Sequence, residues 1–399
     1  MPSIFVGEVI LMRFIHTADL HLGKVLNGER LTDLQSKVLD DLLALVDETE
    51  AEAVVIAGDI YDRSVPPEEA VELFDSFVNR LVMEKGKKLL YIAGNHDSDA
   101  RINYGAKIMS SGGVYIAGDL QREPKPVVLN DEYGRIYFSL IPYVTPSRVR
   151  SIWGEENLSF EEAMDFVVSK EIESVTKKAA EGESLRTVAI AHAFVTGGSI
   201  SGSERELSVG GSGEVKAESF SDYTYTALGH LHGPQRIGEK MWYSGSPLKY
   251  SLNEYAQKKA FLLVDIDGDG GVSVEKRYIK PLKDLRLLEK VTFKEVIDKA
   301  GNMTPSERED FLWLKLDDKE PVLGAMERLR EHYPNILSLE WVNRGTAGED
   351  RVGDGRQLMS QSKERLFESF FEEVTGDKLS DDEREVLRGE LGKAEGGIG

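Results

Sequence analysis

Three short apolar segments in the first hundred residues constrain the fold of this chain more than any other feature. They are residues 12–16, 54–56 and 89–92, and each leads directly into glycine or polar residues. Between them lie two stretches with apolar residues at helical spacing, and Pro66-Pro67 stands at the start of the second. Strands that alternate with helices pair in parallel through right-handed crossovers, so all three strands end at one edge of the same sheet.

A second sheet is predicted from the middle of the chain. Residues 114–141 have the pattern of short strands and turns, and Ser159 with Glu162 forms a capping box for a helix that ends near residue 180. The glycine- and serine-rich residues 197–213 predict a long mobile loop. The strands expected to complete this sheet are residues 187–191, 225–228, 241–244, 260–265 and 273–278.

The length of 399 residues exceeds what one hydrophobic core usually holds, so several domains are expected. We predict an N-terminal extension (1–11), a main α/β domain (12–281), a small β-α-β-α-β domain (282–345), a linker without apolar periodicity (346–362) and a pair of helices (363–395). Two helices cannot bury an apolar stripe alone, so docking onto a partner protein is expected, with packing onto the chain's own domain as the alternative. The stripe consists of Leu366, Phe367, Phe370, Phe371 and Val374.

The composition excludes several classes of protein. Because the chain has no cysteine, it has neither disulfides nor thiolate metal sites nor a cysteine nucleophile. No apolar run approaches the roughly 18 residues of a membrane span, and no basic-then-apolar leader is evident, so we expect a cytoplasmic protein without membrane contact. The formal charge of −21 argues against a broad basic surface for nucleic acid, although a partner subunit can supply the phosphate contacts.

The histidines are concentrated at predicted strand ends. Histidines that serve core packing would be scattered, whereas five of the seven follow a strand within a polar or glycine-flanked turn. His16, inside the first strand, is predicted to be structural, and His332 to lie at the surface or at a helix end. The five strand-end histidines are His21, His96, His192, His230 and His232.

Carboxylates and an amide accompany these histidines. Two residues separated by one on extended backbone project to the same side, which lets Asp19 with His21, and His230 with His232, serve one site. Taken singly, Asp19 could also cap a helix and Asn95 could also stabilise a turn. The spacing and order of all the strand-end groups together favour metal binding. Nitrogen and oxygen ligands without sulfur suit Mn²⁺, Fe²⁺ or Zn²⁺. Together with Asp59 and the remaining histidines there are eight groups, enough for two ions about 3.5 to 4 Å apart that share a carboxylate.

Five pieces follow one another along the chain: Asp19-x-His21, Gly58-Asp59, Gly94-Asn95-His96-Asp97, His192 and Gly229-His230-x-His232. Their residue types and their order resemble the calcineurin-like metallophosphoesterase superfamily. Residues 16–23, 227–232 and 243–247 are similar to the SbcD-type nucleases within it, the bacterial counterparts of the nuclease subunit of double-strand-break repair complexes. The resemblance covers residues 12 to about 280 and extends to the C-terminal part. It implies an α/β two-sheet sandwich flanked by helices, a small α/β capping domain and a C-terminal helical element that binds an SbcC-like, SMC-type ATPase.

The resemblance also implies the roles of the site residues. It assigns Asp19, His21, Asp59 and His232 to one divalent ion and Asp59, Asn95, His192 and His230 to the other, so that Asp59 bridges two ions, for which we expect Mn²⁺. His96, oriented by Asp97, is expected to contact the scissile phosphate. Asp62 departs from the pattern, because some relatives have a DNA-contacting histidine there, and that contact is not carried over.

The function implied by the resemblance is that of a two-metal DNA nuclease, acting as exonuclease and as single-strand and hairpin endonuclease in DNA repair and recombination. A homodimer through the helix at 71–81 is expected. No Gly-x-x-x-x-Gly-Lys-Ser/Thr loop occurs, so ATP is expected to bind the partner. The alternatives are a stand-alone phosphoesterase for small or protein-bound phosphates and a metal-binding scaffold that organises the ATPase with little catalysis.

Overall fold

The computed structural model describes residues 11–181, 183–199, 213–320 and 322–342, and the single residues 384 and 387. These residues divide into two compact units. The first holds the described residues up to 288 with 296–314 and 326–339, and the second holds the rest. Most of the predicted loop 197–213 and the linker 346–362 lie outside the described residues. So do the predicted partner-binding residues, which are Leu366, Phe367, Phe370, Phe371 and Val374.

The first sheet confirms the parallel pairing predicted from the opening segments. Its order is β16-β15-β1-β4-β5-β6. Neighbouring strands from β1 to β6 in this order run parallel, with bounds β1 Met12–Thr17, β4 Ala53–Ile56, β5 Lys88–Ile92 and β6 Val114–Ala117. Their carboxyl ends therefore lie at one edge of the sheet.

Two strands were placed in the wrong sheet by the sequence pattern. Residues 260–265 and 273–278 were expected in the second sheet, but they form β15 (Ala260–Ile266) and β16 (Val272–Tyr278) of the first. β15 pairs antiparallel with β1, with Met12 opposite Ile266, and β16 pairs antiparallel with β15. The pairing joins residues about 250 positions apart, and a local apolar pattern does not identify the partner of a strand.

The second sheet has the order β13-β14-β12-β9-β8-β7. Its four central strands run parallel, and its two edge strands pair antiparallel with their neighbours. The ends of β9 and β12 consequently lie side by side. The bounds are β7 Val127–Asp131, β8 Gly134–Ile141, β9 Arg186–His192, β12 Tyr225–Gly229, β13 Gln235–Ile237 and β14 Met241–Tyr243.

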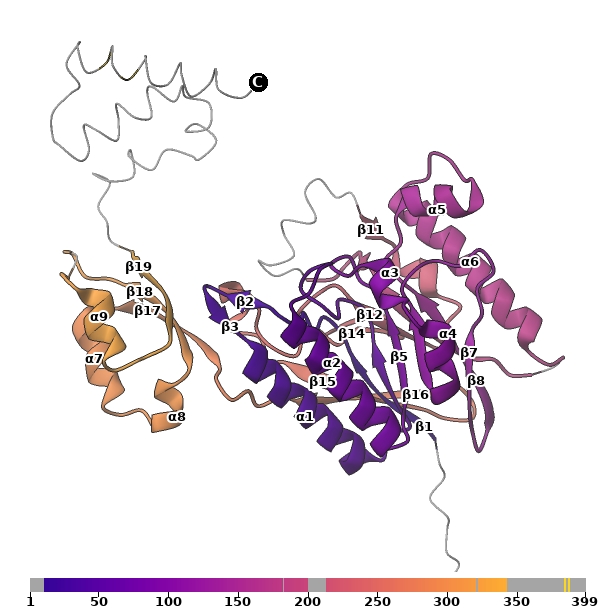
Figure 1. Ribbon diagram of the computed structural model, residues 1–399, viewed down its shortest axis with the longest axis horizontal. Coiled ribbons are helices and arrows are strands. Elements are labelled where there is room, and N and C mark those ends of the chain that lie inside the picture. The colour runs from indigo at the N-terminus through magenta and orange to yellow at the C-terminus, as the bar shows by residue number, and fades with distance from the viewer. Residues whose placement is uncertain are drawn as a thin grey trace, which may run out of the picture. The chain divides into compact units, whose positions relative to one another are not determined.

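Three hydrophobic cores stack the first unit into helix, sheet, sheet and helix layers, which confirms the predicted sandwich (Figure 1). Strand β4 contributes to two of these cores because successive side chains of a strand point to opposite faces of the sheet. Ala53 and Val55 face the core between the sheets, whereas Val54 and Ile56 face the core under the helices. The helices on the first sheet are α1 (Thr32–Thr49) and α2 (Glu68–Asn79), and those on the second are α5 (Pro146–Trp153) and α6 (Phe160–Lys178).

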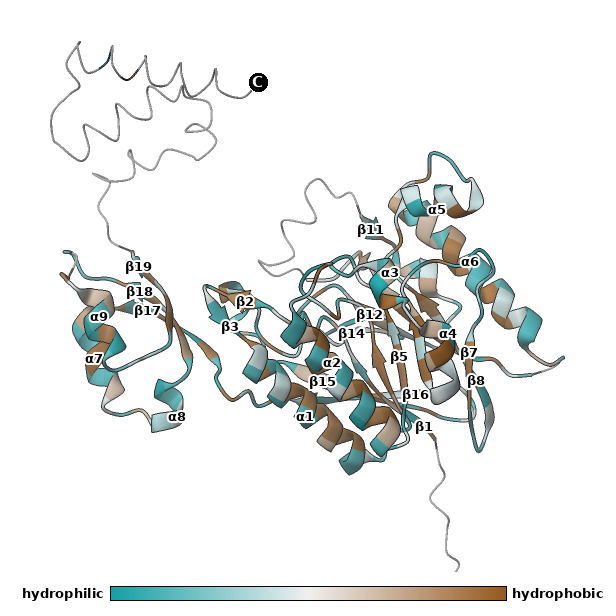
Figure 2. Cartoon of the chain, in the orientation of Figure 1, coloured by the Kyte–Doolittle hydropathy of each residue, from teal (hydrophilic) through white to brown (hydrophobic). Residues whose placement is uncertain are grey.

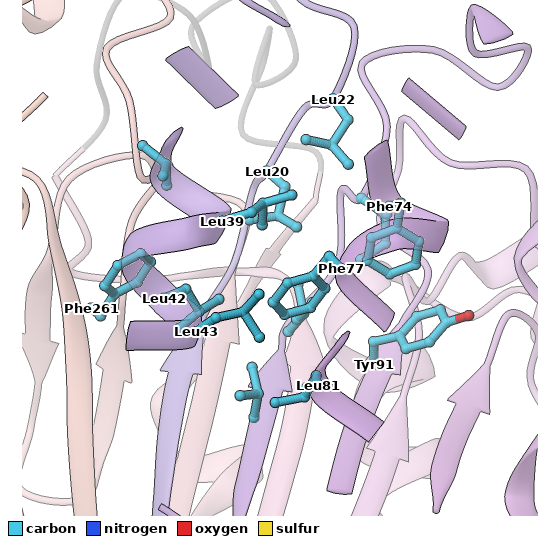
Figure 3. Close-up of a cluster of buried hydrophobic side chains, with 14 of the residues drawn as sticks. Leu20, Leu22, Leu39, Leu42, Leu43, Phe74, Phe77, Leu81, Tyr91 and Phe261 are labelled. Atoms are coloured by element: carbon cyan, nitrogen blue, oxygen red, sulfur yellow. The ribbon is translucent and has the colours of Figure 1, made fainter. Parts of the chain in front are cut away.

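The helices pack through one apolar face each. Figure 2 shows hydrophobic strands in the interior and helices whose hydrophilic residues lie outward. The core under α1 and α2 includes Leu42 and Phe77 of the helices, and the ring of Phe74 and that of Tyr91 of β5 lie 5.4 Å apart within it (Figure 3). The capping box predicted at Ser159 is present at the start of α6. α2 continues into a π-helical turn at Arg80–Glu84.

The remaining elements before residue 285 are short. They are β2 Val25–Leu26, β3 Glu29–Arg30, α3 Asp99–Ile102, α4 Ala106–Met109, β10 Phe194–Val195, β11 Glu214–Val215 and 3₁₀ turns at Ser110–Gly112, Ala217–Phe220 and Leu252–Glu254. Among the residues that the structure describes, no helix combines the length and the apolar character needed to cross a membrane.

Beyond residue 284 the chain forms a three-stranded sheet in the order β17-β18-β19, in the predicted β-α-β-α-β sequence with one extra short helix. The predicted capping box at Thr292 and Glu295 is present, since each backbone N–H donates to the other side chain, at 2.7 and 3.3 Å. The bounds are β17 Leu285–Val291, α7 Phe293–Ala300, α8 Pro305–Arg308, β18 Phe311–Leu316, α9 Ala325–Arg330 and β19 Ile336–Trp341.

Candidate metal centre

The predicted site residues meet where the carboxyl ends of both sheets come together. Five strands contribute: β1, β4 and β5 of the first sheet and β9 and β12 of the second. Parallel strands deliver the residues that follow them to one edge, which is where open α/β sheets bind ligands. The predicted residues brought to this edge are Asp19, His21, Asp59, Asn95, His96, Asp97, His192, His230 and His232.

The backbone at the first two strand ends is held in a rare conformation. The backbone N–H groups of Asp19 and His21 donate to the carbonyl oxygens of Gly58 and Asp59, each at 3.0 Å, which extends the pairing beyond β1 and β4. Asp19, His21 and Asp59 have φ of 53°, 43° and 51°, and a left-handed backbone costs a non-glycine residue on the order of 1–3 kcal/mol. Such strain persists where the surroundings impose it, and it concentrates at functional sites.

Two glycines allow the strand ends to approach each other. A Cβ atom on Gly58, which has φ of 91°, would lie 2.3 Å from Nδ1 of His192. A Cβ atom on Gly94 would lie 2.1 Å from Oδ1 of Asp59. Both positions therefore require glycine, because a larger residue would displace a predicted ligand.

One group of predicted ligands consists of Asp19, His21 and His232. Each offers a ligand atom, and these atoms all lie within 4.8 Å of one another. The Nε2 atoms of His21 and His232 are 3.2 Å apart. The Asp19 carboxylate also accepts the backbone N–H of His230 at 2.9 Å, which holds it in place. All three side chains are buried.

A second group consists of Asn95, His192 and His230. Oδ1 of Asn95 lies 2.9 Å from Nε2 of His192 and 3.0 Å from Nδ1 of His230. Nδ1 of His192 lies 2.9 Å from the carbonyl oxygen of Ala57, which can only accept, so that nitrogen carries the ring proton. Nε2 therefore turns a lone pair toward the Asn95 oxygen. Two acceptors at this distance repel each other unless a cation lies between them.

The carboxylate of Asp59 lies between the two groups. Its Oδ2 is 3.6 Å from Nε2 of His21 and 3.5 Å from Nε2 of His192. Asp59 also forms ligand clusters with His21 and His96, and with Asp19 and His192. This set of buried carboxylates and imidazoles with the half-buried amide of Asn95 fits divalent cations, and the position of Asp59 is compatible with the predicted bridge. Each ligand role remains a prediction.

Burial sets the charge of the cluster. It lowers the pKa of His21 and of His192, and with the nearby His192 it lowers the pKa of His230 to about 3. These imidazoles are therefore neutral at physiological pH, as metal ligation requires. Burial and the neighbouring Asp59 raise the pKa of Asp97 to about 7. The charge of Asp59 thus disfavours a second ionised carboxylate beside it, a repulsion that a bound cation would offset.

The expectation that Asp97 orients His96 is wrong in the structure. The Asp97 carboxylate accepts the backbone N–H of Gly94 at 2.9 Å and those of residues 60 and 61 at 3.0 Å. Nδ1 of His96 instead lies 3.1 Å from the carbonyl oxygen of Asp62. Two of these N–H groups lie in the turn after β4 and the third follows β5, and a carboxylate that satisfies all three is not available to an imidazole.

Several buried polar residues behind the predicted ligands were missed in the sequence. Nε2 of Gln35 donates to the carbonyl oxygen of His21 at 2.7 Å and to the hydroxyl of Tyr250 at 3.3 Å, and Glu254 contacts His232. Gln35 lies on the buried face of α1, and a polar residue within an apolar stripe is the one signal that marks it. No local pattern marks Tyr250 or Glu254.

Two protein families match the chain. Calcineurin-like phosphoesterases match residues 12–234, which is more than half of the sequence. The SbcD C-terminal family, the type 5 capsule protein repressor C-terminal domain, matches residues 281–375. The first match includes every predicted metal ligand and both predicted catalytic residues, from Asp19 to His232.

Three solved structures match part of the chain at low sequence identity. A dimetal phosphatase from Danio rerio is 12% identical, with a TM-score of 0.42, over 68% of this chain and 98% of its own. The protein TT1561 of Thermus thermophilus is 10% identical, with a TM-score of 0.38, and the match covers 67% of this chain and 99% of that protein. The sulfate thiohydrolase SoxB of Thermus thermophilus, in complex with glycerol, is 14% identical, with a TM-score of 0.35. The match covers 67% of this chain and 56% of SoxB.

Proposed function

The chain belongs to the calcineurin-like phosphoesterase family, and on this premise we propose that it is a two-metal-dependent DNA nuclease. The position of the Asp59 carboxylate between His21 and His192 is the observation that carries the proposal. The match to the SbcD C-terminal family supports an SbcD-type subunit that works with an SbcC-like ATPase on DNA ends in repair and recombination. Its place in the cell would then be the cytoplasm, at the nucleoid.

The proposed ligand sets follow the two groups of the site. Asp19, His21, Asp59 and His232 hold one ion, and Asp59, Asn95, His192 and His230 hold the other. When bound, two divalent ions neutralise the charge of a phosphodiester and acidify a water molecule. We propose Mn²⁺ as the metal, one of the ions, with Fe²⁺ and Zn²⁺, that suit a set of imidazole nitrogen with carboxylate and amide oxygen.

His96 is proposed to contact the scissile phosphate. Its backbone N–H donates to Asp59 at 2.9 Å, which ties the loop after β5 to the shared carboxylate. Its Nδ1 lies 3.1 Å from the Asp62 carbonyl oxygen, which only accepts, so Nδ1 donates and Nε2 remains for the substrate. Asp97 then acts as a positioning residue, because it fixes the loop that carries Asn95 and His96.

The partners proposed are DNA, the SbcC-like ATPase and a second copy of the chain. In the helix predicted for dimerisation, Phe74, Phe77 and Leu81 are buried in the core under α1 and α2, whereas Val71 is 44% exposed. More strongly exposed apolar side chains lie around α4, where Tyr104 is 85% and Ile108 is 80% exposed. We propose this segment as the contact between two copies, since large exposed apolar groups mark interaction sites.

One assay separates the proposed function from its alternatives. The full chain is given Mn²⁺ with single-stranded, hairpin or blunt DNA, with and without the ATPase, beside a small phosphodiester. We expect DNA cleavage that Mn²⁺ supports and a chelator abolishes. Hydrolysis of the small phosphodiester without DNA cleavage in either condition would favour a stand-alone phosphoesterase. Absence of both activities, with two bound ions, would favour a scaffold.

A further inference from the structure

Glu254 contacts the predicted ligand His232 from the side away from the other ligands. Oε1 of Glu254 lies 2.9 Å from Nδ1 of His232. The Glu254 side chain is fully buried. Resting on the metal-dependent function proposed above, we propose that Glu254 is a positioning residue that sets the orientation and tautomer of His232, and that Lys259 holds Glu254 in place.

The Glu254 carboxylate is itself held from two further directions. Its Oε2 accepts a hydrogen bond from Nζ of Lys259 at 2.6 Å and from the backbone N–H of Tyr250 at 3.2 Å. Nζ of Lys259 also donates to the carbonyl oxygen of His232 at 2.9 Å and to Oγ of Ser246 at 2.8 Å. One buried cation thus contacts both the backbone of His232 and the acid that faces its ring.

This geometry decides which ring nitrogen of His232 carries the proton. A carboxylate paired with a buried lysine only accepts hydrogen bonds, so Nδ1 of His232 must donate to Glu254. Nε2 then keeps its lone pair, and it lies 3.2 Å from Nε2 of His21. A carboxylate behind a ligating histidine fixes the ring and makes it a stronger ligand. Glu254 therefore prepares His232 for the group that contains Asp19 and His21.

The buried pair of Glu254 and Lys259 is better explained by a role in positioning His232 than by a contribution to the stability of the fold. Taking a carboxylate and an ammonium out of water is costly, so apolar residues of similar volume often stabilise a fold at least as well. His192 and His96 each face a backbone carbonyl, from Ala57 and Asp62 respectively. His232 faces a side chain instead, so substitution can test its support without moving the backbone.

The test compares metal binding in the full chain with the substitutions Glu254→Gln, Glu254→Ala and Lys259→Met. The matched control is Asp131→Asn, which breaks a buried ion pair of the second sheet in which Arg186 donates twice to Asp131 at 2.7 Å. Mn²⁺ titration calorimetry should show one of two ions bound about 10–100-fold more weakly in Glu254→Ala and Lys259→Met, and a smaller loss in Glu254→Gln. The control should bind both ions as the wild type does.

A second readout needs no metal and no activity. In ¹⁵N-histidine-labelled, metal-free protein, the long-range ¹H–¹⁵N spectrum should report a protonated Nδ1 for His232, and Glu254→Gln or Glu254→Ala should shift that population toward protonated Nε2. Unchanged Mn²⁺ affinity and an unchanged tautomer in folded Glu254 variants would overturn the inference. So would an equal loss of Mn²⁺ affinity in Asp131→Asn. Wild-type protein that binds two Mn²⁺ but cleaves no DNA would refute the proposed nuclease function alone.

Discussion

Oδ1 of Asp59 accepts the backbone N–H of His96 at 2.9 Å. This contact leaves Oδ2 facing both groups of the site, 3.6 Å from Nε2 of His21 and 3.5 Å from Nε2 of His192. The shared carboxylate and the loop that is proposed to contact the phosphate are therefore positioned by one hydrogen bond. We expect a substitution at Asp59 to affect metal binding and a substitution of the His96 side chain to affect catalysis.

Substitution Asp59→Ala should remove both metal ions. The carboxylate is the one predicted ligand common to the two groups, so each would lose a negatively charged ligand at once. Metal content measured by mass spectrometry should fall from two ions per chain to less than one, whereas Asp131→Asn should retain two. Two ions per chain in folded Asp59→Ala would refute the bridging assignment.

Substitution His96→Ala should keep both metal ions and lose nuclease activity. His96 is proposed to act on the phosphate, and a positioned acid or base contributes roughly 10²–10⁴-fold to rate. Cleavage of a DNA hairpin with Mn²⁺ measures the loss, and metal content serves as the control. Normal cleavage would remove His96 from the mechanism, and loss of one ion would make it a ligand instead.

Substitution Asp97→Asn should destabilise the fold and lower activity without removing metal. An amide presents one acceptor oxygen and turns an NH₂ group toward N–H groups that the carboxylate now satisfies. A buried donor left unsatisfied costs about 1–3 kcal/mol. Chemical denaturation measures the stability. Unchanged stability would show that this loop does not depend on the carboxylate.

Stability should decrease as pH rises, through Glu171 on α6. Burial raises the pKa of its carboxyl from 4.5 to about 7. Between these values the unfolded chain has lost the proton and the folded chain keeps it, so the free energy of unfolding falls as pH rises through this window, by at most about 3 kcal/mol. Glu171→Gln should remove this contribution, so that the difference in free energy of unfolding between wild type and variant changes by that amount between pH 5 and 8, while the contribution of Asp97 remains. The exposed-residue control Glu181→Gln should keep the contribution of Glu171.

Substitution Ile108→Asp should dissociate the proposed homodimer. A charge within an apolar contact between two copies is desolvated without a partner, which disfavours association. Sedimentation velocity should show a monomer, with hydrolysis of a small phosphodiester retained. Leu323→Asp, at another highly exposed apolar residue, is the control and should stay dimeric. A dimeric Ile108→Asp variant would place the contact elsewhere.

The sequence by itself determined which residue types meet at the candidate site. Apolar segments that alternate with helical stretches form parallel strands, and parallel strands bring the residues that follow them to one edge. His21, Asp59 and Asn95 could be placed together for this reason, without any knowledge of their distances. His192 follows a strand of the other sheet, and its position at a strand end and the family resemblance joined it to them. The capping box at Ser159 was equally predictable, because its hydrogen bonds span only three residues.

Only the tertiary structure decided the partners of these groups. Pairing of β15 with β1, support of His96 by the Asp62 carbonyl and support of His232 by Glu254 each join segments that no local pattern connects. Asp97 shows the physical reason most clearly. Its carboxylate binds N–H groups that lack a strand partner, and which groups lack one depends on where neighbouring strands end after packing.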